Sequence, residues 1–147
     1  MKIQQLSLFL ENKPGRLAEP CRLLAQAGIN IRTLSVADTQ QFGILRLIVS
    51  DWQKAASLLA NAGYACKVTE VLAVEVPDRP GGLAAILELF ESGPVNIEYM
   101  YAFPFGKQDK AVILFRFDKP DEAIERLQAA GVNVLAGVDI YNGGSQK

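Results

Sequence analysis

One seven-residue pattern occurs twice in this chain, and that internal repeat limits the possible folds more than any other feature. The segment ENKPGRL at 11–17 recurs as PDRPGGL at 77–83, with proline, glycine and leucine each offset by 66 residues. The Asn-Ile pairs that begin at Asn30 and Asn96 keep the same offset. A repeat of this length predicts two copies of one structural unit.

Each copy shows the same order of predicted elements. A strand with alternating apolar residues leads into the Pro-Gly turn, and an amphipathic helix that ends at a glycine follows. Two apolar strands come next, a second amphipathic helix ends at Gly63 or Gly131, and a final strand returns the chain. The two middle strands are expected at 30–38 and 44–49 in the first copy, and at 96–105 and 111–117 in the second.

This βαββαβ order predicts an α+β fold made of two ferredoxin-like units in tandem, each an antiparallel sheet with its helices on one face. We expect the first copy at 1–68 and the second at 69–147. No linker rich in Pro, Ser or Gly separates them, since 64–76 reads as the last strand of one copy running into the first strand of the next. Such a short connection predicts two rigidly associated halves.

Both second helices carry a recognisable start signal. The segment from Ser50 to Gln53 fits a capping box with Ser50 as the N-cap. In the second copy Asp118 is expected to cap the helix, and Pro120 suits the first turn because it needs no intrahelical donor there.

Composition excludes several classes of function. The chain of 147 residues has no histidine, which removes the commonest activator of Ser or Cys nucleophiles and the commonest transition-metal ligand. Its 15 basic and 16 acidic residues supply no field for a nucleic-acid partner. Two distant cysteines form neither a disulfide framework nor a metal motif. We therefore expect no enzyme activity, no cofactor and no metal.

Localisation follows from the distribution of apolar residues. The N-terminal segment lacks the long apolar core of a secretory signal, and no segment approaches the ~20 apolar residues of a membrane span. The expectation is a cytoplasmic protein that does not use a membrane as a partner.

The motif Asn/Asp-Lys/Arg-Pro-Gly-x-Leu after the first strand, followed by a helix and Gly-(x)-Val/Ile-Asn-Ile, resembles the ACT domain over nearly the whole chain. This resemblance implies a regulatory module that binds a free amino acid, or a similar small ligand, between paired ACT units. It also implies allosteric regulation of amino-acid metabolism through a separate enzyme. Because an unpaired edge strand rarely stays exposed, we further expect a homodimer.

The candidate ligand-binding residues lie in the two turns and the two strand entries. Glycine after proline lets the backbone approach a carboxylate, and asparagine can both donate to and accept from a zwitterion. The set is Asn12, Pro14, Gly15, Asn30 and Ile31 in the first copy, and Asp78, Gly81, Asn96 and Ile97 in the second.

The second copy departs from the motif. Pro94 is inserted before the Asn-Ile pair, and aromatic residues alternate along the next strand, at Tyr99, Tyr101, Phe103 and Phe105. Their spacing is typical of core or interface packing, so the pattern favours the first turn as the ligand site. The alternative function is a ligand-free interaction module that assembles or stabilises a partner enzyme, and these aromatic residues with Asp78 motivate it.

Overall fold

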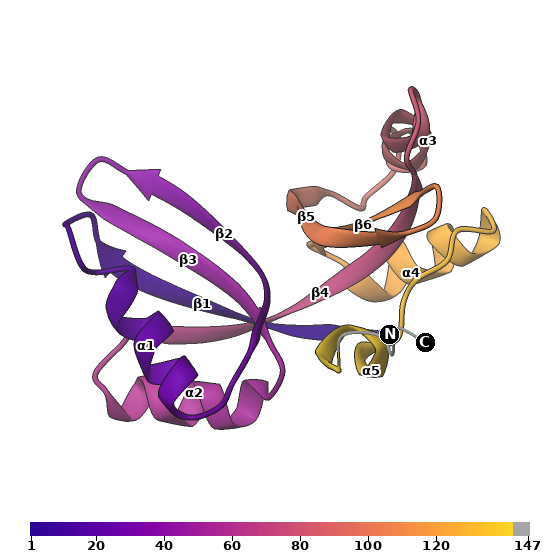
Figure 1. Ribbon diagram of the computed structural model, residues 1–147. Coiled ribbons are helices and arrows are strands. Elements are labelled where there is room, and N and C mark those ends of the chain that lie inside the picture. The colour runs from indigo at the N-terminus through magenta and orange to yellow at the C-terminus, as the bar shows by residue number, and fades with distance from the viewer. Residues whose placement is uncertain (143–147) are drawn as a thin grey trace. The chain divides into compact units, whose positions relative to one another are not determined.

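The computed structural model describes residues 1–142 of the chain. Six strands and five helices are assigned within that part of the chain (Figure 1). The strands are β1 (Ile3–Glu11), β2 (Ile31–Thr39), β3 (Phe42–Val49), β4 (Cys66–Pro77), β5 (Ile97–Lys107) and β6 (Lys110–Phe117). The helices are α1 (Ala18–Gln26), α2 (Trp52–Asn61), α3 (Gly82–Glu88), α4 (Pro120–Ala129) and α5 (Gly137–Tyr141).

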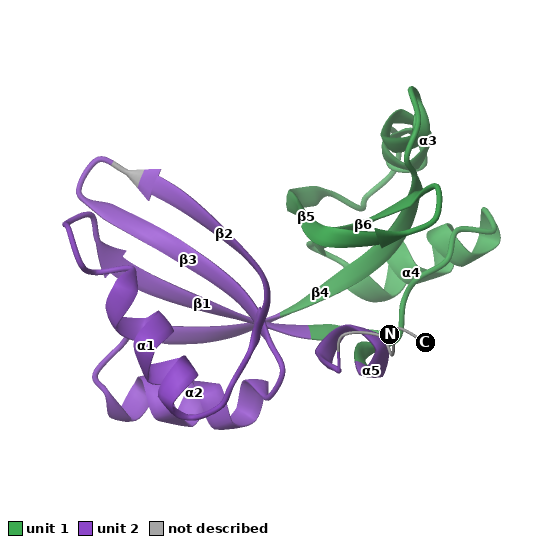
Figure 2. Cartoon of the chain, in the orientation of Figure 1, with its two compact units in different colours: residues 1–3, 70–137 green, residues 4–69, 138–147 purple. Residues whose placement is uncertain are grey.

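The chain forms two compact units, coloured separately in Figure 2. Of the described residues, unit 1 contains 1–3 and 70–137, and unit 2 contains 4–69 and 138–142. Strand β4 runs from one unit into the other, as the absence of a linker predicted. The change of unit within this strand lies between Thr69 and Glu70, next to the boundary expected from the repeat.

In unit 2 the antiparallel strands lie in the order β2-β3-β1. Alternation along β1 directs Leu6, Leu8 and Leu10 to one face, where they pack with residues of β3 and of the two helices. Figure 1 shows α1 and α2 together on that side of the sheet. The core of unit 2 comprises Leu6, Leu8, Leu10, Leu24, Ile29, Leu45, Leu47, Val49, Ala55 and Leu59.

Unit 1 repeats this arrangement with the order β4-β6-β5. Its core contains more aromatic residues than that of unit 2. Phe117 stacks on Phe115 with ring centroids 5.7 Å apart, and it contacts Phe90 with ring centroids 4.7 Å apart. The prediction of a final strand in this copy was wrong. Only an isolated antiparallel bridge joins Val134 to Val74, and the chain then turns into α5.

The two chain ends pack on the unit formed by the other repeat. Lys2, in unit 1, forms ion pairs with Asp121 at 2.9 Å and with Glu70 at 3.5 Å. In unit 2 the Tyr141 hydroxyl accepts a hydrogen bond from the Gln4 backbone N–H at 2.6 Å, and burial raises the pKa of Tyr141. Each unit is therefore completed by a terminal segment that the repeat boundaries assigned elsewhere.

The two expected helix caps were wrong, and for the same reason. Asp51, not Ser50, is the N-cap of α2 and accepts from the Lys54 N–H, while Lys119 occupies that position in α4 without a side-chain cap. Ser50 Oγ instead accepts from the Asn30 N–H at 3.0 Å. The expected position of proline in the first turn of α4 is confirmed.

The corresponding bond in unit 1 joins Asp118 Oδ1 to the Asn96 N–H at 2.8 Å. In both units the return bond runs from the Ser50 or Asp118 N–H to the asparagine carbonyl, at 2.9 and 3.1 Å. The side-chain oxygens thus tie the strand after the first helix to the start of the second helix.

Removing either tie should destabilise its own unit. We expect Ser50→Ala and Asp118→Ala each to lower the free energy of unfolding by about 1 kcal/mol, since each leaves a backbone N–H without its acceptor. Urea denaturation followed by circular dichroism measures this. Ser57→Ala, at an exposed position of α2, is the control and should be neutral or slightly stabilising, because alanine favours the helix. Equal effects of Ser57→Ala and Ser50→Ala would contradict the assigned role.

Candidate functional site

The candidate site residues fall into two groups at opposite ends of each sheet. In unit 1, Pro77 before the Pro-Gly turn pairs with Lys110, whereas Ile97 pairs with Phe117 at the other end of β6. Seven residues at about 3.3 Å each separate these ends by roughly 23 Å. Unit 2 repeats this separation along β3, with Phe42 at the turn end and Val49 beside Ile31. Within one unit, the turn and the Asn-Ile pair therefore do not form one cluster.

At the strand entries, Asn30 and Asn96 are exposed, and their backbones make the ties described above. Ile31 and Ile97 begin β2 and β5 and pack against the cores of their units. These four residues hold the far end of each sheet together.

At the turns, the backbone N–H of Asn12 donates to the Gln41 carbonyl at 2.9 Å, and that of Asp78 donates to the Asp109 carbonyl at 2.7 Å. Both bonds fix the turn to the neighbouring hairpin. Gly15 and Gly81 each adopt a φ of 86°, which explains glycine at these positions. Pro14 is exposed beside Gly15.

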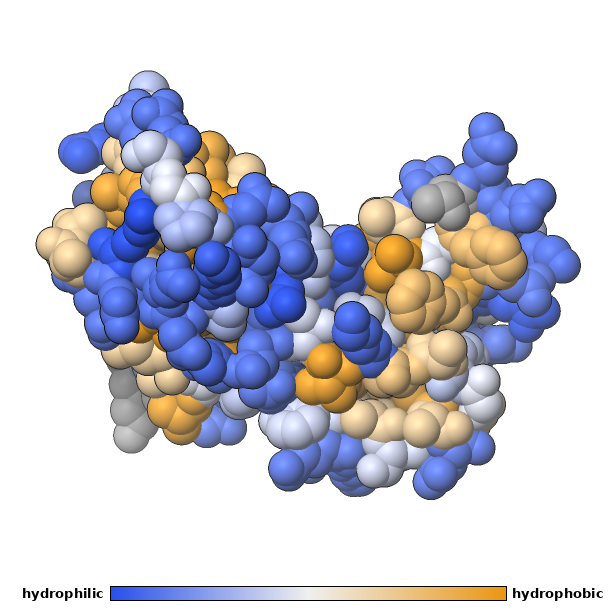
Figure 3. Space-filling view, turned by 180° about the vertical axis from the view of Figure 1, so that it is seen from behind, coloured by the Kyte–Doolittle hydropathy of each residue, from blue (hydrophilic) through white to orange (hydrophobic). Residues whose placement is uncertain are grey.

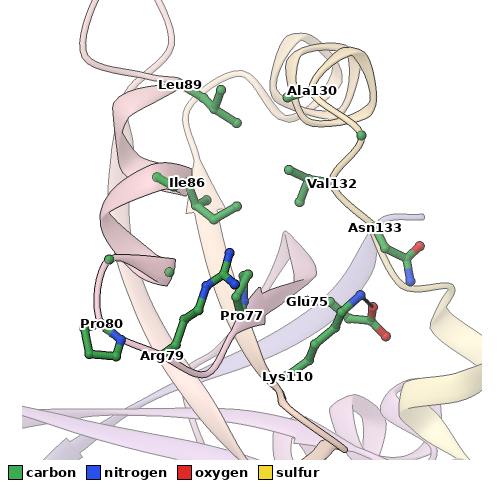
Figure 4. Close-up of a pocket in the computed structure, with 14 residues that line it drawn as sticks. Glu75, Pro77, Arg79, Pro80, Ile86, Leu89, Lys110, Ala130, Val132 and Asn133 are labelled. Carbon is green, nitrogen blue, oxygen red and sulfur yellow. Dashed lines mark hydrogen bonds and ion pairs between the residues drawn. The ribbon is translucent and has the colours of Figure 1, made fainter.

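A pocket of about 430 Å³ lies beside the second turn, entirely within unit 1. Figure 4 shows Ile86 of α3 and Leu89, the residue after α3, on one side of it and Ala130 and Val132, after α4, on the other. Its volume falls within the range typical of small-molecule sites. Of the nine candidate residues Gly81 alone lines it, and it opens at the second turn although the sequence favoured the first.

Charged side chains lie at the turn end of this pocket. Arg79 rises from the turn towards Ile86 (Figure 4), and within residues 1–142 its guanidinium has no carboxylate in ion-pair range. Glu75 pairs with Lys110 at 3.5 Å, with 13% of the Glu75 side chain exposed. Among the residues that line the pocket, two cations and one mostly buried carboxylate lie at this end, which suits a ligand with a carboxylate.

Sequence reasoning missed most of the residues that line the pocket. Arg79 lay inside the recognised motif, whereas Val132 and Asn133 follow the Gly131 helix end and carried no signal of their own. Alignment of the copies at the 68-residue offset could have identified Val132, because Tyr64 occupies its place in the first copy.

The two-unit architecture and the duplicated turns agree with a comparison against known families. A model of the ACT domain pair family matches residues 1–142. The chain belongs to the ACT domain pair family. The expected α+β fold, with ferredoxin-like ACT units in tandem and helices on one face, is confirmed.

Several solved structures resemble the chain in fold. The protein BT0572 from Bacteroides thetaiotaomicron is 41% identical, with a TM-score of 0.89, over 96% of both chains. The ligand-free regulatory subunit of aspartate kinase from Thermus thermophilus is 16% identical, with a TM-score of 0.61, over 86% of this chain and 91% of its own. The regulatory subunit of aspartate kinase from Thermus flavus is 18% identical, with a TM-score of 0.61, over 87% of this chain and 90% of its own. These two show the fold alone. No curated protein matches the chain.

None of the helices within 1–142 is long and apolar enough to cross a membrane. The same part of the chain contains no group of three or more Cys, Asp or Glu side chains placed to hold a metal ion.

Proposed function

We propose that this ACT pair is a stand-alone regulatory module that binds a free amino acid, or a similar small ligand, and thereby modulates amino-acid metabolism. The unit 1 pocket carries the proposal, because it joins an apolar cavity to the charged groups Arg79, Lys110 and Glu75. Such a site complements the carboxylate and ammonium of an amino acid. Of the turn residues, Gly81 lines the pocket and Asp78 directly precedes Arg79.

We propose that the regulated activity belongs to a separate metabolic enzyme. ACT domains are regulatory modules, and the aspartate kinase structures that share the fold are named as regulatory subunits. The chain also lacks histidine, the side chain that most often activates Ser or Cys nucleophiles. We place the protein in the cytoplasm, where the free thiols of Cys21 and Cys66 would stay reduced.

We also propose a homodimer. Strand β2 lies at a sheet edge in unit 2, and its Leu34 and Val36 side chains are 47% and 50% exposed. An apolar edge of this kind is usually covered by another chain. Light scattering at working concentration should give twice the 16.0 kDa chain mass, and a monomer would contradict this part of the proposal.

Thermal denaturation with each of the twenty amino acids at millimolar concentration tests the sensor function. A ligand at 100 times its dissociation constant adds about 2.7 kcal/mol to the free energy of unfolding, which is a measurable rise in melting temperature. We expect at least one amino acid to produce this rise, and isothermal titration should then give saturable binding. The proposal fails if none stabilises protein shown to be folded.

An interaction module without a ligand is the second candidate function, and one surface favours it. Phe9 and Phe42 of unit 2 are 51% and 55% exposed, at the positions that Glu75 and Lys110 occupy in unit 1. Figure 3 shows apolar side chains gathered on the surface of unit 2. Amino-acid binding by protein that recovers no partner from native lysate would exclude this candidate.

A further inference from the structure

The two ACT units carry corresponding clefts of unequal size, about 430 Å³ in unit 1 and about 290 Å³ in unit 2. The unit 2 cleft is lined by Glu19, Arg22, Leu23, Gln26, Ala62 and Tyr64. At the repeat offsets of 66 and 68, Glu19, Leu23 and Tyr64 correspond to Ala85, Leu89 and Val132 of the unit 1 pocket. The two clefts therefore occupy the same place between the first helix and the end of the second.

A side-chain pair occupies the cleft of unit 2. The Tyr64 hydroxyl donates to Glu19 Oε2 at 3.0 Å, across the space between α1 and the end of α2. Loss of contact with water, and then the hydrogen bond to Glu19, raise the pKa of Tyr64, so the phenol stays a donor at neutral pH. In unit 1 the corresponding Val132 and Ala85 are shorter side chains that cannot form such a bond, and the cleft is the larger of the two.

The basic residue of the Pro-Gly turn also has a different ion-pair environment in the two units. Lys13 of unit 2 is paired with Glu11 at 2.9 Å. The corresponding residues in unit 1 are Arg79 and Pro77, and within residues 1–142 no carboxylate lies in ion-pair range of the guanidinium. A planar guanidinium without a partner is suited to bidentate binding of a carboxylate.

The remaining pocket groups restrict the ligand further. Glu75 is mostly buried, and its partner Lys110 is held only at 3.5 Å, so the carboxylate retains capacity for a second cation. Beyond the charged end, Ile86, Leu89 and Val132 present only hydrocarbon (Figure 4). A polar side chain placed there would lose its hydrogen bonds to water without replacement.

From these contrasts we propose that the ACT pair binds one α-amino acid with an apolar side chain per chain, in the unit 1 pocket. Arg79 holds the carboxylate, Glu75 the ammonium, and Ile86, Leu89 and Val132 contact the side chain. Unit 2 binds none, because the Tyr64–Glu19 pair bridges its smaller cleft and Phe9 replaces the ammonium partner. This inference rests on the proposed sensor function and specifies its ligand class, its location and its stoichiometry.

The first test exchanges the residues that distinguish the two clefts. The double variant Ala85→Glu/Val132→Tyr transfers the unit 2 pair into unit 1 and should abolish binding of L-leucine, L-isoleucine, L-valine and L-phenylalanine in isothermal titration. The reverse variant Glu19→Ala/Tyr64→Val should leave wild-type affinity and one ligand per chain, because unit 2 has no equivalent of Glu75. Unchanged binding in the first variant, or two ligands per wild-type chain, would overturn the inference.

The second test separates the charged contacts. Arg79→Met should weaken binding about 10–100-fold, the size expected for loss of a charged hydrogen bond. Arg22→Met, which removes a cation lining the unit 2 cleft, is the matched control and should change nothing. L-Leucinamide lacks the carboxylate and 4-methyl-2-oxopentanoate lacks the ammonium, so both should bind at least tenfold more weakly than L-leucine. Equal binding of either compound would contradict the assigned contact.

The outcomes distinguish this inference from the function on which it rests. Binding of no amino acid at all would refute the sensor function. Binding that prefers polar amino acids such as L-aspartate or L-glutamine, or that survives Arg79→Met, would leave the sensor function in place and refute the pocket assignment.

Discussion

Replacing Gly82 by alanine should destabilise unit 1 by about 2–3 kcal/mol, the upper range for forcing extra atoms into a packed site. An added Cβ would lie 2.0 Å from the Pro77 carbonyl oxygen and 3.0 Å from its carbonyl carbon. Both atoms are backbone and cannot swing aside as a side chain would. Urea denaturation should show a lower midpoint by circular dichroism, while fluorescence of the single Trp52 reports on unit 2.

Helix propensity alone predicts the opposite change in stability, so the experiment distinguishes the two effects. Gly82 is the first residue of α3, where alanine would ordinarily stabilise a helix by about 0.5–1 kcal/mol. The control is Gly43→Ala, whose Cβ would meet only the Ala37 carbonyl oxygen at an ordinary 3.7 Å. Gly43→Ala should be neutral or slightly stabilising. A higher midpoint for Gly82→Ala would show that α3 does not approach Pro77 this closely.

Truncating Phe117 to alanine should cost about 3–5 kcal/mol, the usual range for a large aromatic side chain in a core. Phe117 is 1% exposed and contacts both Phe90 and Phe115, so its removal leaves a cavity where β6 meets α3. A loss of this size is a large part of the 5–15 kcal/mol that stabilises a typical domain. Chemical denaturation of the purified variant measures it directly.

Phe105→Ala provides the comparison for the aromatic core. Phe105 is 41% exposed and packs on Phe103 with ring centroids 5.4 Å apart, so about 1 kcal/mol is expected from the lost ring contact. If the two phenylalanine variants were equally destabilised, Phe117 would not be the centre of the unit 1 core.

The pocket and the core of unit 1 depend on the same short helix. Ile86 belongs to the buried cluster and also lines the pocket, and Gly82 sets how closely α3 approaches Pro77. Arg126 of α4 donates to the carbonyls of Leu89 and Ser92, at 3.1 and 2.9 Å, and so holds the other end of this segment. In the proposed sensor, a ligand that contacts Ile86 and Leu89 would therefore stabilise a helix already fixed at both ends.

The sequence by itself determined the order of elements, the fold and the family of this protein. Apolar periodicity and turn chemistry are local properties, so the helix ends at Gly63 and Gly131 and the run of β4 through the boundary could be predicted from short segments. The repeat then supplied the architecture, because two copies of one pattern fold alike.

Only the tertiary structure decided where these residues meet. Strand length sends the Pro-Gly turn and the Asn-Ile pair to opposite ends of a sheet, and Ser50 and Asp118 bond to the preceding strand instead of capping a helix. The open pocket depends on whether residues 45 positions apart, such as Glu19 and Tyr64, come within hydrogen-bonding distance. Contacts of that kind arise from packing between elements, and no local pattern in the sequence encodes them.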